Sequence, residues 1–366
     1  MDYQFIISQS DNGVGHITLN SERTLNALNQ KMAEEMIALL NQWENDPSIF
    51  CIFLDSSGER AFCAGGDIKN LYLALKDQQE EKINQTCLNF FITEYTLDYK
   101  IHTYSKPIIS WNTGITMGGG MGLMNGASHR IVTETSLLAM PEVSIGLYPD
   151  VGATYFFNKL PPGVGKFLGV TGARFNAGDA LTLGLADFFM ESHLREKVLT
   201  SLKKISWTNS RSSNDSLIKD CLTSLSSKDL PSPYSQPYLS HFAKLASVTE
   251  INDFEEVIKD FPQNEWIQKS IETFKKGSPT SAAIILKQLE QGKDLTLKQV
   301  FMSELNLSVH CSLNADFPEG VRALLIDKDQ SPKWSPPTTD QLTQEVIDSY
   351  FIPLWNKDDH PFRAWS

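Results

Sequence analysis

Two carboxylates, Glu142 and Asp150, lie eight positions apart in the stretch MPEVSIGLYPDVG, with no basic residue between them. This spacing matches no helical register, but a loop can turn both side chains toward one bound molecule. Apolar neighbours raise a carboxyl pKa by desolvation, which suits general acid or base catalysis. The same residues also fit an ordinary turn, residues 149–152, with a solvent-facing Glu142. The fragment alone leaves both interpretations open.

Two glycine-rich segments carry backbone N–H groups that can stabilise negative charge. In RAFCAGGDI, residues 60–68, two glycines lie between a predicted strand and a predicted helix, and taken alone an ordinary turn is favoured there. In GITMGGGMGLMNGASHR, residues 114–130, three glycines begin an apolar helix, where unpaired N–H groups meet the positive end of the helix dipole. Close helix packing explains that segment equally well. Together the segments predict two donors from separate loops, as the oxyanion of a thioester reaction requires.

Several other catalytic motifs are absent from the sequence. No Gly-Lys-Ser/Thr follows the glycine triplet and no GxSxG occurs, which argues against a P-loop and against a serine nucleophile. The five cysteines are scattered and form no CxxC pair, which favours a reducing compartment over a disulfide framework. Cys63 lies in an apolar strand end, where a packed thiol is expected rather than a nucleophile. Without CxxC, HExxH or clustered histidines, we expect no dedicated metal site.

The composition is ordinary for a globular protein. Hydrophobic residues make up 41% of the 366 residues, enough for a sizeable core. The formal net charge is −12 without any dense Lys/Arg cluster, so we expect no nucleic-acid partner. No apolar run reaches the roughly 20 residues that span a bilayer, and the start MDYQFIISQS lacks signal- or transit-peptide character. We therefore expect no membrane association, and a cytoplasmic location in a bacterium or the mitochondrial matrix for a processed eukaryotic enzyme.

The hydropathy pattern divides the chain into three parts. In residues 1–204, short apolar strands, including FIISQ and VGHITL around the turn SDNG, alternate with helical patterns such as ALNQKMAEEMIALLNQW, which predicts an α/β fold. Residues 205–237 are rich in Ser, Asn and Pro and predict a linker or an irregular segment. Residues 238–366 predict a mostly helical region. One of its helices has Ser278 as the predicted N-cap and Pro279 at the first helical position.

Four motifs, taken in this order, resemble the enoyl-CoA hydratase/isomerase (crotonase) superfamily: LNALN, AFCAGGDI, GITMGGGMG and MPEVSIGLYPDVG. Two later stretches, SPTSAAIILKQL and DFPEGVRALLIDKDQSPKW, are similar to the C-terminal signature of its 3-hydroxyisobutyryl-CoA hydrolase branch. The resemblance covers nearly the whole chain apart from the Ser-rich segment. It implies a crotonase-like spiral of ββα units for the α/β core, with an acyl-CoA bound between glycine loops and helices.

The resemblance also implies roles for individual residues. The backbone N–H groups of Gly66 and Gly119 match the two oxyanion-hole positions. Glu142 and Asp150 match the catalytic acids, and together with Gly119 they would bind the substrate. Glu94 matches a further substrate-binding glutamate, although an exposed helix face around residues 85–103 also explains it. Coenzyme A is part of the substrate, so no separate cofactor is implied, and a homo-oligomer is compatible with the family.

The implied reaction is hydrolysis of a short β-hydroxyacyl-CoA thioester, with 3-hydroxyisobutyryl-CoA of valine catabolism as the substrate. Hydratases of the superfamily carry a second glutamate two residues after the glycine triplet, where this chain has Gly122, so hydration is disfavoured. The alternatives are a dienoyl-CoA isomerase or hydratase-like enzyme, and a non-catalytic acyl-CoA-binding protein. The C-terminal signature argues against the isomerase, and the intact acid pair argues against mere binding.

Overall fold

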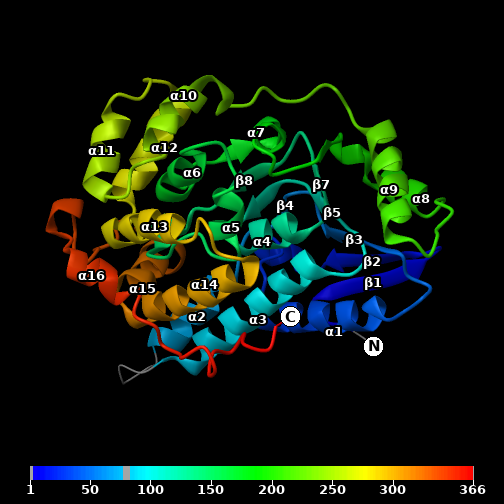
Figure 1. Ribbon diagram of the computed structural model, residues 1–366, viewed down its shortest axis with the longest axis horizontal. Helices are drawn as coiled ribbons and strands as arrows, with labels where there is room; N and C mark the ends of the chain where they lie inside the picture. The colour runs from blue at the N-terminus through cyan, green and yellow to red at the C-terminus, as the bar shows by residue number, and fades with distance from the viewer. Residues whose placement is uncertain (1–2, 77–82, 366) are drawn as a thin grey trace. The chain divides into compact units, whose positions relative to one another are not determined.

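The computed structural model describes residues 3–76 and 83–365 (Figure 1). The chain divides into two compact units. Unit 1 consists of Met1–Gly66, Thr96–Leu138 and Phe175–Gln236, and unit 2 consists of Asp67–Tyr95, Ala139–Arg174 and Pro237–Ser366. Each unit therefore combines three separate segments of the chain. This division interleaves the predicted α/β core, 1–204, with the predicted helical region, 238–366.

Unit 1 is built on two sheets. The larger sheet has the strand order β1 (Ile6–Asp11), β2 (Val14–Leu19), β3 (Cys51–Ser56), β5 (Ile108–Asn112), β7 (His129–Val132) and β10 (Phe188–Phe189). The smaller sheet has the order β4 (Ala61–Cys63), β6 (Ile115–Met117), β8 (Leu137–Ala139) and β9 (Phe175–Asn176). In the larger sheet only the β1–β2 hairpin is antiparallel, and its predicted turn is confirmed by the positive φ angles of Asn12 and Gly13.

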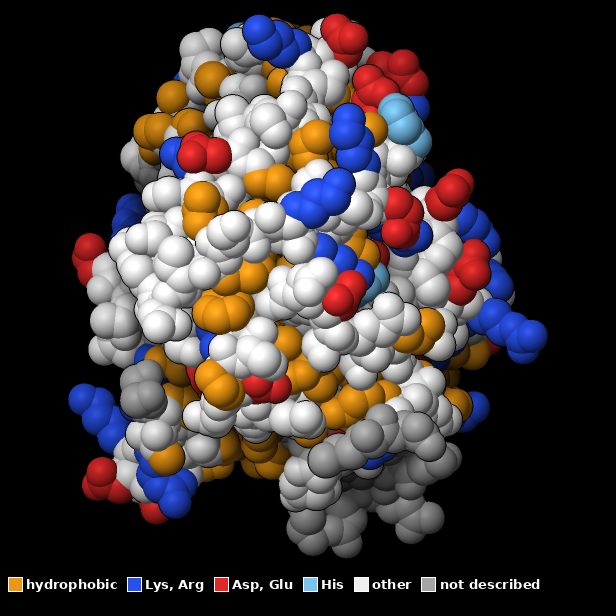
Figure 2. All heavy atoms as spheres, turned by 90° about the vertical axis from the view of Figure 1, so that its right-hand side faces the viewer, with side chains coloured by type: hydrophobic (Ala, Val, Ile, Leu, Met, Phe, Trp, Pro, Cys, Tyr) orange, Lys and Arg blue, Asp and Glu red, His pale blue; other side chains and the backbone are white. Residues whose placement is uncertain are grey.

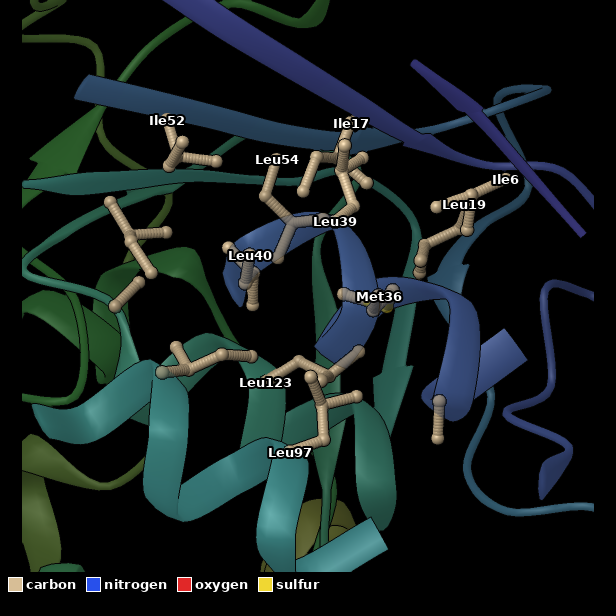
Figure 3. Close-up of a cluster of buried hydrophobic side chains, with 14 of the residues drawn as sticks. Ile6, Ile17, Leu19, Met36, Leu39, Leu40, Ile52, Leu54, Leu97 and Leu123 are labelled. Atoms are coloured by element: carbon tan, nitrogen blue, oxygen red, sulfur yellow. The ribbon is translucent and has the colours of Figure 1, made fainter. Parts of the chain in front are cut away.

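The helix predicted from ALNQKMAEEMIALLNQW is confirmed as α1 (Gln30–Glu44) and covers the core of the larger sheet. Figure 3 shows Met36, Leu39 and Leu40 of α1 among the buried side chains of β2 and β3. Burial of side chains of this size stabilises the fold by about 1.5–3 kcal/mol each. Phe62 of β4 belongs to the same cluster. This core therefore anchors the strand that leads directly into the first glycine segment.

The segment 205–237, predicted to be a linker or irregular, contains the helix α9 (Arg211–Leu225). Ser210 caps this helix by accepting a hydrogen bond from the backbone N–H of Ser213. Ile218 and Leu222, four residues apart, are buried in a hydrophobic cluster of unit 1. A narrow apolar face within a Ser-rich sequence is sufficient to dock a helix on a sheet. The other helices of unit 1 are η1 (Glu22–Thr24), α4 (Gly119–Gly126), α7 (Ala177–Thr182), η3 (Ser192–Leu194) and α8 (Arg195–Leu202).

Unit 2 is helical. Its helices from the first two segments are α2 (Ile68–Lys76), the first half of α3 (Gln85–Thr103), η2 (Glu142–Ile145), α5 (Ala153–Phe157) and α6 (Val164–Thr171). The third segment begins with η4 (Gln236–Tyr238), α10 (Leu239–Phe242), η5 (Ala243–Leu245), α11 (Ile251–Lys259), α12 (Glu265–Lys276) and α13 (Pro279–Gln291). It continues with α14 (Leu297–Leu313), α15 (Asp316–Val321), the π-helical turn η6 (Arg322–Ile326), η7 (Thr339–Gln341) and α16 (Gln344–Ser349). The predicted Ser278 cap is confirmed, because its side chain accepts from the backbone N–H of Ser281.

Charged side chains of both signs lie on the surface of the protein. Figure 2 shows acidic and basic side chains interspersed over the face that it views. Such a mixed face offers no continuous basic stripe for a phosphate backbone among its described residues. In the described ranges, no helix has both the length and the apolar character needed to cross a bilayer.

A close backbone approach inside unit 2 fixes the turn η2, which begins at Glu142. Gly146 ends this turn with a φ of +71°, and a Cβ atom there would lie 2.3 Å from the carbonyl oxygen of Asp316 in α15. From the other side, a Cβ on Gly320 would lie 2.5 Å from the carbonyl carbon of Ile145. Glycine at both positions therefore lets α15 pack directly on the backbone of η2.

We predict that Gly146→Ala destabilises the protein more than Gly184→Ala. Gly184 has a φ of +77° and no neighbouring atom within 4 Å of an added Cβ, so alanine there adds only backbone strain, about 1 kcal/mol. At Gly146 the same strain is joined by a clash with the α15 backbone, for a total of about 3 kcal/mol or more. Urea unfolding of the two variants measures the difference. Equal losses of stability would contradict the proposed packing constraint.

Candidate active site

Glu142 and Asp150 are both buried in unit 2. Glu142 is the first residue of η2, and Asp150 lies in the loop before α5; each side chain is 5% exposed. Oε2 of Glu142 has no hydrogen-bond partner among the described residues. The solvent-facing turn that the sequence left open is therefore excluded. The structure instead has a buried carboxyl with one free oxygen, which suits a group that acts on a bound molecule.

Burial changes the acidity of both groups. It raises the pKa of Glu142 well above the usual glutamate range, and the nearby Asp150 carboxylate raises it further. Burial also raises the pKa of Asp150 to about 6. Each unit by which a carboxyl pKa rises favours the protonated form by 1.36 kcal/mol relative to the ionised form. Both carboxyls therefore prefer the ionised form less strongly than they would in water.

Glu94 is a third buried acid of the same cluster. It lies in α3 and is 3% exposed, so the interpretation as an exposed helix face is wrong. Burial raises its pKa well above the usual range, and the charges of Asp150 and Glu142 add to this. The three carboxyls therefore lie within electrostatic reach of one another inside unit 2. Groups that interact in this way titrate together and share protons.

Hydroxyl groups connect Asp150 by hydrogen bonds to helix α14 of the C-terminal region. The Tyr95 hydroxyl donates a hydrogen bond of 2.6 Å to Oδ2 of Asp150, and it lies 2.6 Å from Oγ of Ser308 in α14. Oγ of Ser308 also lies 2.9 Å from the hydroxyl of Tyr148. The Tyr148 hydroxyl in turn donates to the backbone carbonyl of Glu304. Asp150 is thus positioned by residues from three segments that are far apart in sequence.

The Glu304 side chain holds the backbone that follows Asp150. Its two carboxylate oxygens accept from the N–H groups of Gly152, at 2.7 Å, and Thr154, at 3.0 Å. Burial raises the pKa of Glu304 to about 8, although these two N–H donors act in the opposite direction. Val151, between Asp150 and Gly152, has a φ of +52°, which is costly for a β-branched residue. Glu304 therefore stabilises a strained loop at the candidate site.

The four residues that hold Asp150 were not identified from the sequence. Tyr95 is in no quoted motif, and Tyr148, although it lies within MPEVSIGLYPDVG, was given no role, because the hydroxyl contacts of both depend on tertiary structure. Glu304 and Ser308 did leave a signal, because they are polar residues four positions apart within the apolar pattern of α14. A polar pair at that spacing on a buried helix face predicts a shared buried contact.

The two glycine segments meet within unit 1. A Cβ on Gly65 would lie 3.4 Å from the carbonyl oxygen of Met117, and one on Gly120 would lie 2.2 Å from the carbonyl oxygen of Cys63. Among the described residues, the backbone N–H groups of Gly66 and Gly119 have no protein acceptor, since Gly119 is the first residue of α4. Both N–H groups are therefore available to a bound oxygen, as the sequence suggested.

The sequence matches one family along most of its length. The family described as enoyl-CoA hydratase/isomerase matches residues 14–351. A protein named 3-hydroxyisobutyryl-CoA hydrolase, mitochondrial, from Gallus gallus is 38% identical over 359 residues, which cover 96% of this chain and 90% of that protein. The protein of the same name from Bos taurus is 39% identical over 352 residues, covering 94% and 87%.

Solved structures confirm the crotonase-like fold. A carnitinyl-CoA dehydratase from Mycobacterium thermoresistibile aligns with a TM-score of 0.87 and 27% identity, covering 99% of this chain and 100% of that chain. An enoyl-CoA hydratase from Rhodobacter sphaeroides 2.4.1 aligns with a TM-score of 0.84 and 30% identity, covering 96% and 98%. On the match to the family along residues 14–351 and the identity of these relatives, the chain belongs to the enoyl-CoA hydratase/isomerase family.

Proposed function

We propose that the protein hydrolyses a short β-hydroxyacyl-CoA thioester, with 3-hydroxyisobutyryl-CoA as the substrate and valine degradation as the pathway. The observation that carries this proposal is the buried acid cluster of Glu142, Asp150 and Glu94, in which Glu142 keeps an oxygen without a protein partner. Relatives that align with 96% and 94% of this chain bear the name of that hydrolase. Their names also specify mitochondria, which supports the matrix as the location if the source is eukaryotic; a bacterial enzyme would be cytoplasmic.

In the proposed mechanism, Glu142 begins the reaction. Its carboxylate either attacks the thioester carbonyl carbon, giving an anhydride that water then cleaves, or removes a proton from the water that attacks. The carbonyl oxygen becomes negative in both routes, and the N–H groups of Gly66 and Gly119 are the proposed donors to it. A single turnover in ¹⁸O-labelled water separates the routes, because only the anhydride route transfers the label into Glu142.

The two other acids handle the substrate hydroxyl and the leaving group. Asp150 holds the β-hydroxyl and supplies the proton to the departing sulfur of coenzyme A. Its pKa of about 6, raised by burial, keeps a proton on this carboxyl closer to neutral pH than an exposed aspartate could. Glu94 is proposed to contact the same end of the substrate, since its pKa responds to both catalytic acids. Coenzyme A enters as part of the substrate and leaves as the thiol product, and the proposed reaction uses no further cofactor.

Hydration of a double bond is the less suitable reaction for this chain. It requires a second acid after the glycine triplet, and Gly122 at that position lies inside α4. The isomerase alternative would use the Glu142 and Asp150 pair without water, so it differs in its product. Thiol release from a hydroxyacyl-CoA distinguishes it from a shift of diene absorbance.

We predict that Glu142→Gln lowers the rate of thiol release from 3-hydroxyisobutyryl-CoA at least about 100-fold. The affinity for coenzyme A, measured by calorimetry, should stay nearly unchanged because binding does not need the carboxylate. Glu35→Gln is the matched control: Glu35 is a buried glutamate in unit 1 that accepts from the N–H groups of Gln4 and Phe5. Turnover that survives Glu142→Gln would refute the role of Glu142, and diene shifts without thiol release would favour the isomerase.

We also predict a bell-shaped dependence of kcat/KM on pH. The active form has Glu142 ionised and Asp150 protonated, because one must act as base or nucleophile and the other as acid. Activity therefore falls at low pH, where both carry a proton, and at high pH, where both have lost it. Asp150→Asn should therefore remove the alkaline limb and lower the maximum about 10- to 100-fold. Asp179→Asn, at a buried aspartate of unit 1 that accepts from Ser235, should keep both limbs. An alkaline limb that persists in Asp150→Asn would assign it to another group.

A further inference from the structure

A chain of hydroxyl groups connects Asp150 to the backbone of α14. The Tyr95 oxygen lies 2.6 Å from Oδ2 of Asp150 and 2.6 Å from Oγ of Ser308. Oγ of Ser308 lies 2.9 Å from the Tyr148 oxygen, which lies 2.5 Å from the carbonyl oxygen of Glu304. All of these residues belong to unit 2 and are buried. The chain thus has four consecutive oxygen–oxygen contacts, each short enough for a hydrogen bond.

The number of protons in this chain depends on Asp150. Tyr95, Ser308 and Tyr148 supply one hydroxyl proton each. When Asp150 is ionised, Tyr95 must donate to the carboxylate and Tyr148 to the carbonyl. Ser308 then has one proton for its contacts with both tyrosines. It donates to Tyr95, whose oxygen becomes the better acceptor when its own proton is given to a carboxylate, so the contact with Tyr148 stays without a hydrogen bond.

A proton on Asp150 completes the chain. Asp150 then donates to Tyr95, Tyr95 to Ser308, and Ser308 to Tyr148. Tyr148 still donates to the carbonyl of Glu304, so all four contacts contain a proton. Ionisation of Asp150 therefore reverses the direction of the first bond and removes one hydrogen bond from a buried network, where an unmade bond is costly.

We propose that Ser308 and Tyr148 are positioning residues that act through the hydroxyl of Tyr95 and stabilise the protonated form of Asp150. The inference rests on the proposed function, in which Asp150 is the acid of the reaction. When Asp150 gives its proton to the substrate, Tyr95 turns to donate to the new carboxylate and stabilises its charge. When Asp150 regains a proton, the chain returns to its complete form.

The charged groups around Asp150 do not explain a dependence on Ser308. Glu94 faces Asp150 from α3, and Glu142 faces it from η2. A negative charge on Asp150 raises the pKa of each of these two glutamates. Glu304 and Cys311 face it from α14 and respond in the same direction, as do the two tyrosines of the chain. Negative charges on these acidic groups would disfavour a negative charge on Asp150, whereas the hydrogen bond from Tyr95 favours it. Ser308 carries no charge, so any effect of its removal on Asp150 must pass through the hydroxyl chain.

The test is the titration of Asp150 in protein labelled with ¹³C at the aspartate carboxyl carbons, followed by NMR without substrate. Asp150→Asn identifies the Asp150 signal. Ser308→Ala removes two hydrogen bonds from the protonated form and one from the ionised form. We expect the Asp150 midpoint to fall by roughly half to one pH unit in this variant.

Three further variants complete the comparison. Tyr95→Phe also removes two neutral bonds from the protonated form, but from the ionised form it removes the stronger charge-assisted bond to the carboxylate and leaves a buried charge without a donor. It should therefore raise the Asp150 midpoint, opposite to Ser308→Ala. Ser312→Ala is the matched serine control, since Ser312 lies one turn further along α14, is buried, and donates to the carbonyl of Val309 at 2.7 Å. Tyr104→Phe is the matched tyrosine control, because Tyr104 is buried and donates to the carbonyl of Leu40 at 2.7 Å. Both controls should leave the midpoint unchanged.

An unchanged or raised Asp150 midpoint in Ser308→Ala would overturn the proposal, because Tyr95 would then act only as a donor. If Ser308→Ala does not fold, isotope-edited infrared spectra of wild-type tyrosine C–O bonds decide the question. If the hydroxyl chain exists, the C–O bands of two tyrosines shift at the pH of the Asp150 midpoint, and in Tyr148→Phe only one such band shifts. A response from one tyrosine in the wild type would also overturn it.

The two proposals fail separately. The NMR titration needs no turnover, so a midpoint shift in Ser308→Ala without thioesterase activity would support the chain and reject the hydrolase. Thiol release by the wild type with no midpoint shift would reject the chain alone. If both hold, the alkaline limb of kcat/KM moves to lower pH in Ser308→Ala and to higher pH in Tyr95→Phe.

Discussion

The carboxylate of Glu304, held between two backbone N–H groups, is the interaction on which the acid site most depends. Glu304 is fully buried, and without the N–H groups of Gly152 and Thr154 both of its carboxyl oxygens would lack a hydrogen-bond partner. Those same bonds keep Val151 at a φ of +52°, a conformation that costs on the order of 1–3 kcal/mol. A helix from the C-terminal region thus determines the path of the loop that carries Asp150.

The same region supports Glu142. Helix α15 packs on the backbone of η2 at Gly146, and the N–H of Ser278, at the start of α13, donates to the carbonyl of Val143. Glu142 and Asp150 come from the middle of the sequence, but α15 and the start of α13, which hold η2, come from its last third. The helices after residue 237 are therefore part of the acid site's own unit, in which burial raises both pKa values.

Local sequence patterns predicted the features that depend on neighbouring residues alone, such as helices, caps and turns. The 3.6-residue period identified α1, the Ser278 cap identified the start of α13, and Asn12–Gly13 identified a hairpin. The division into interleaved units was not predictable, because it depends on contacts between segments distant in sequence. Helix α9 was missed because its apolar face is narrow within a Ser-rich stretch. The motifs named the acids, but the contacts by which the hydroxyls of Tyr95, Tyr148 and Ser308 position Asp150 form only when the chain is folded.

Buried acids this close together cannot all ionise, and this constrains how the site can work. Each additional charge would meet the others in a medium that screens poorly, so the pKa values of Glu94, Glu142 and Asp150 are all raised and their titrations are linked. A lysine or arginine beside Asp150 would have stabilised its ionised form. Acids and neutral hydroxyls instead leave its two protonation states close in free energy. A carboxyl in that condition can give up a proton and regain it within one catalytic cycle, which is the behaviour that thioester hydrolysis asks of Asp150.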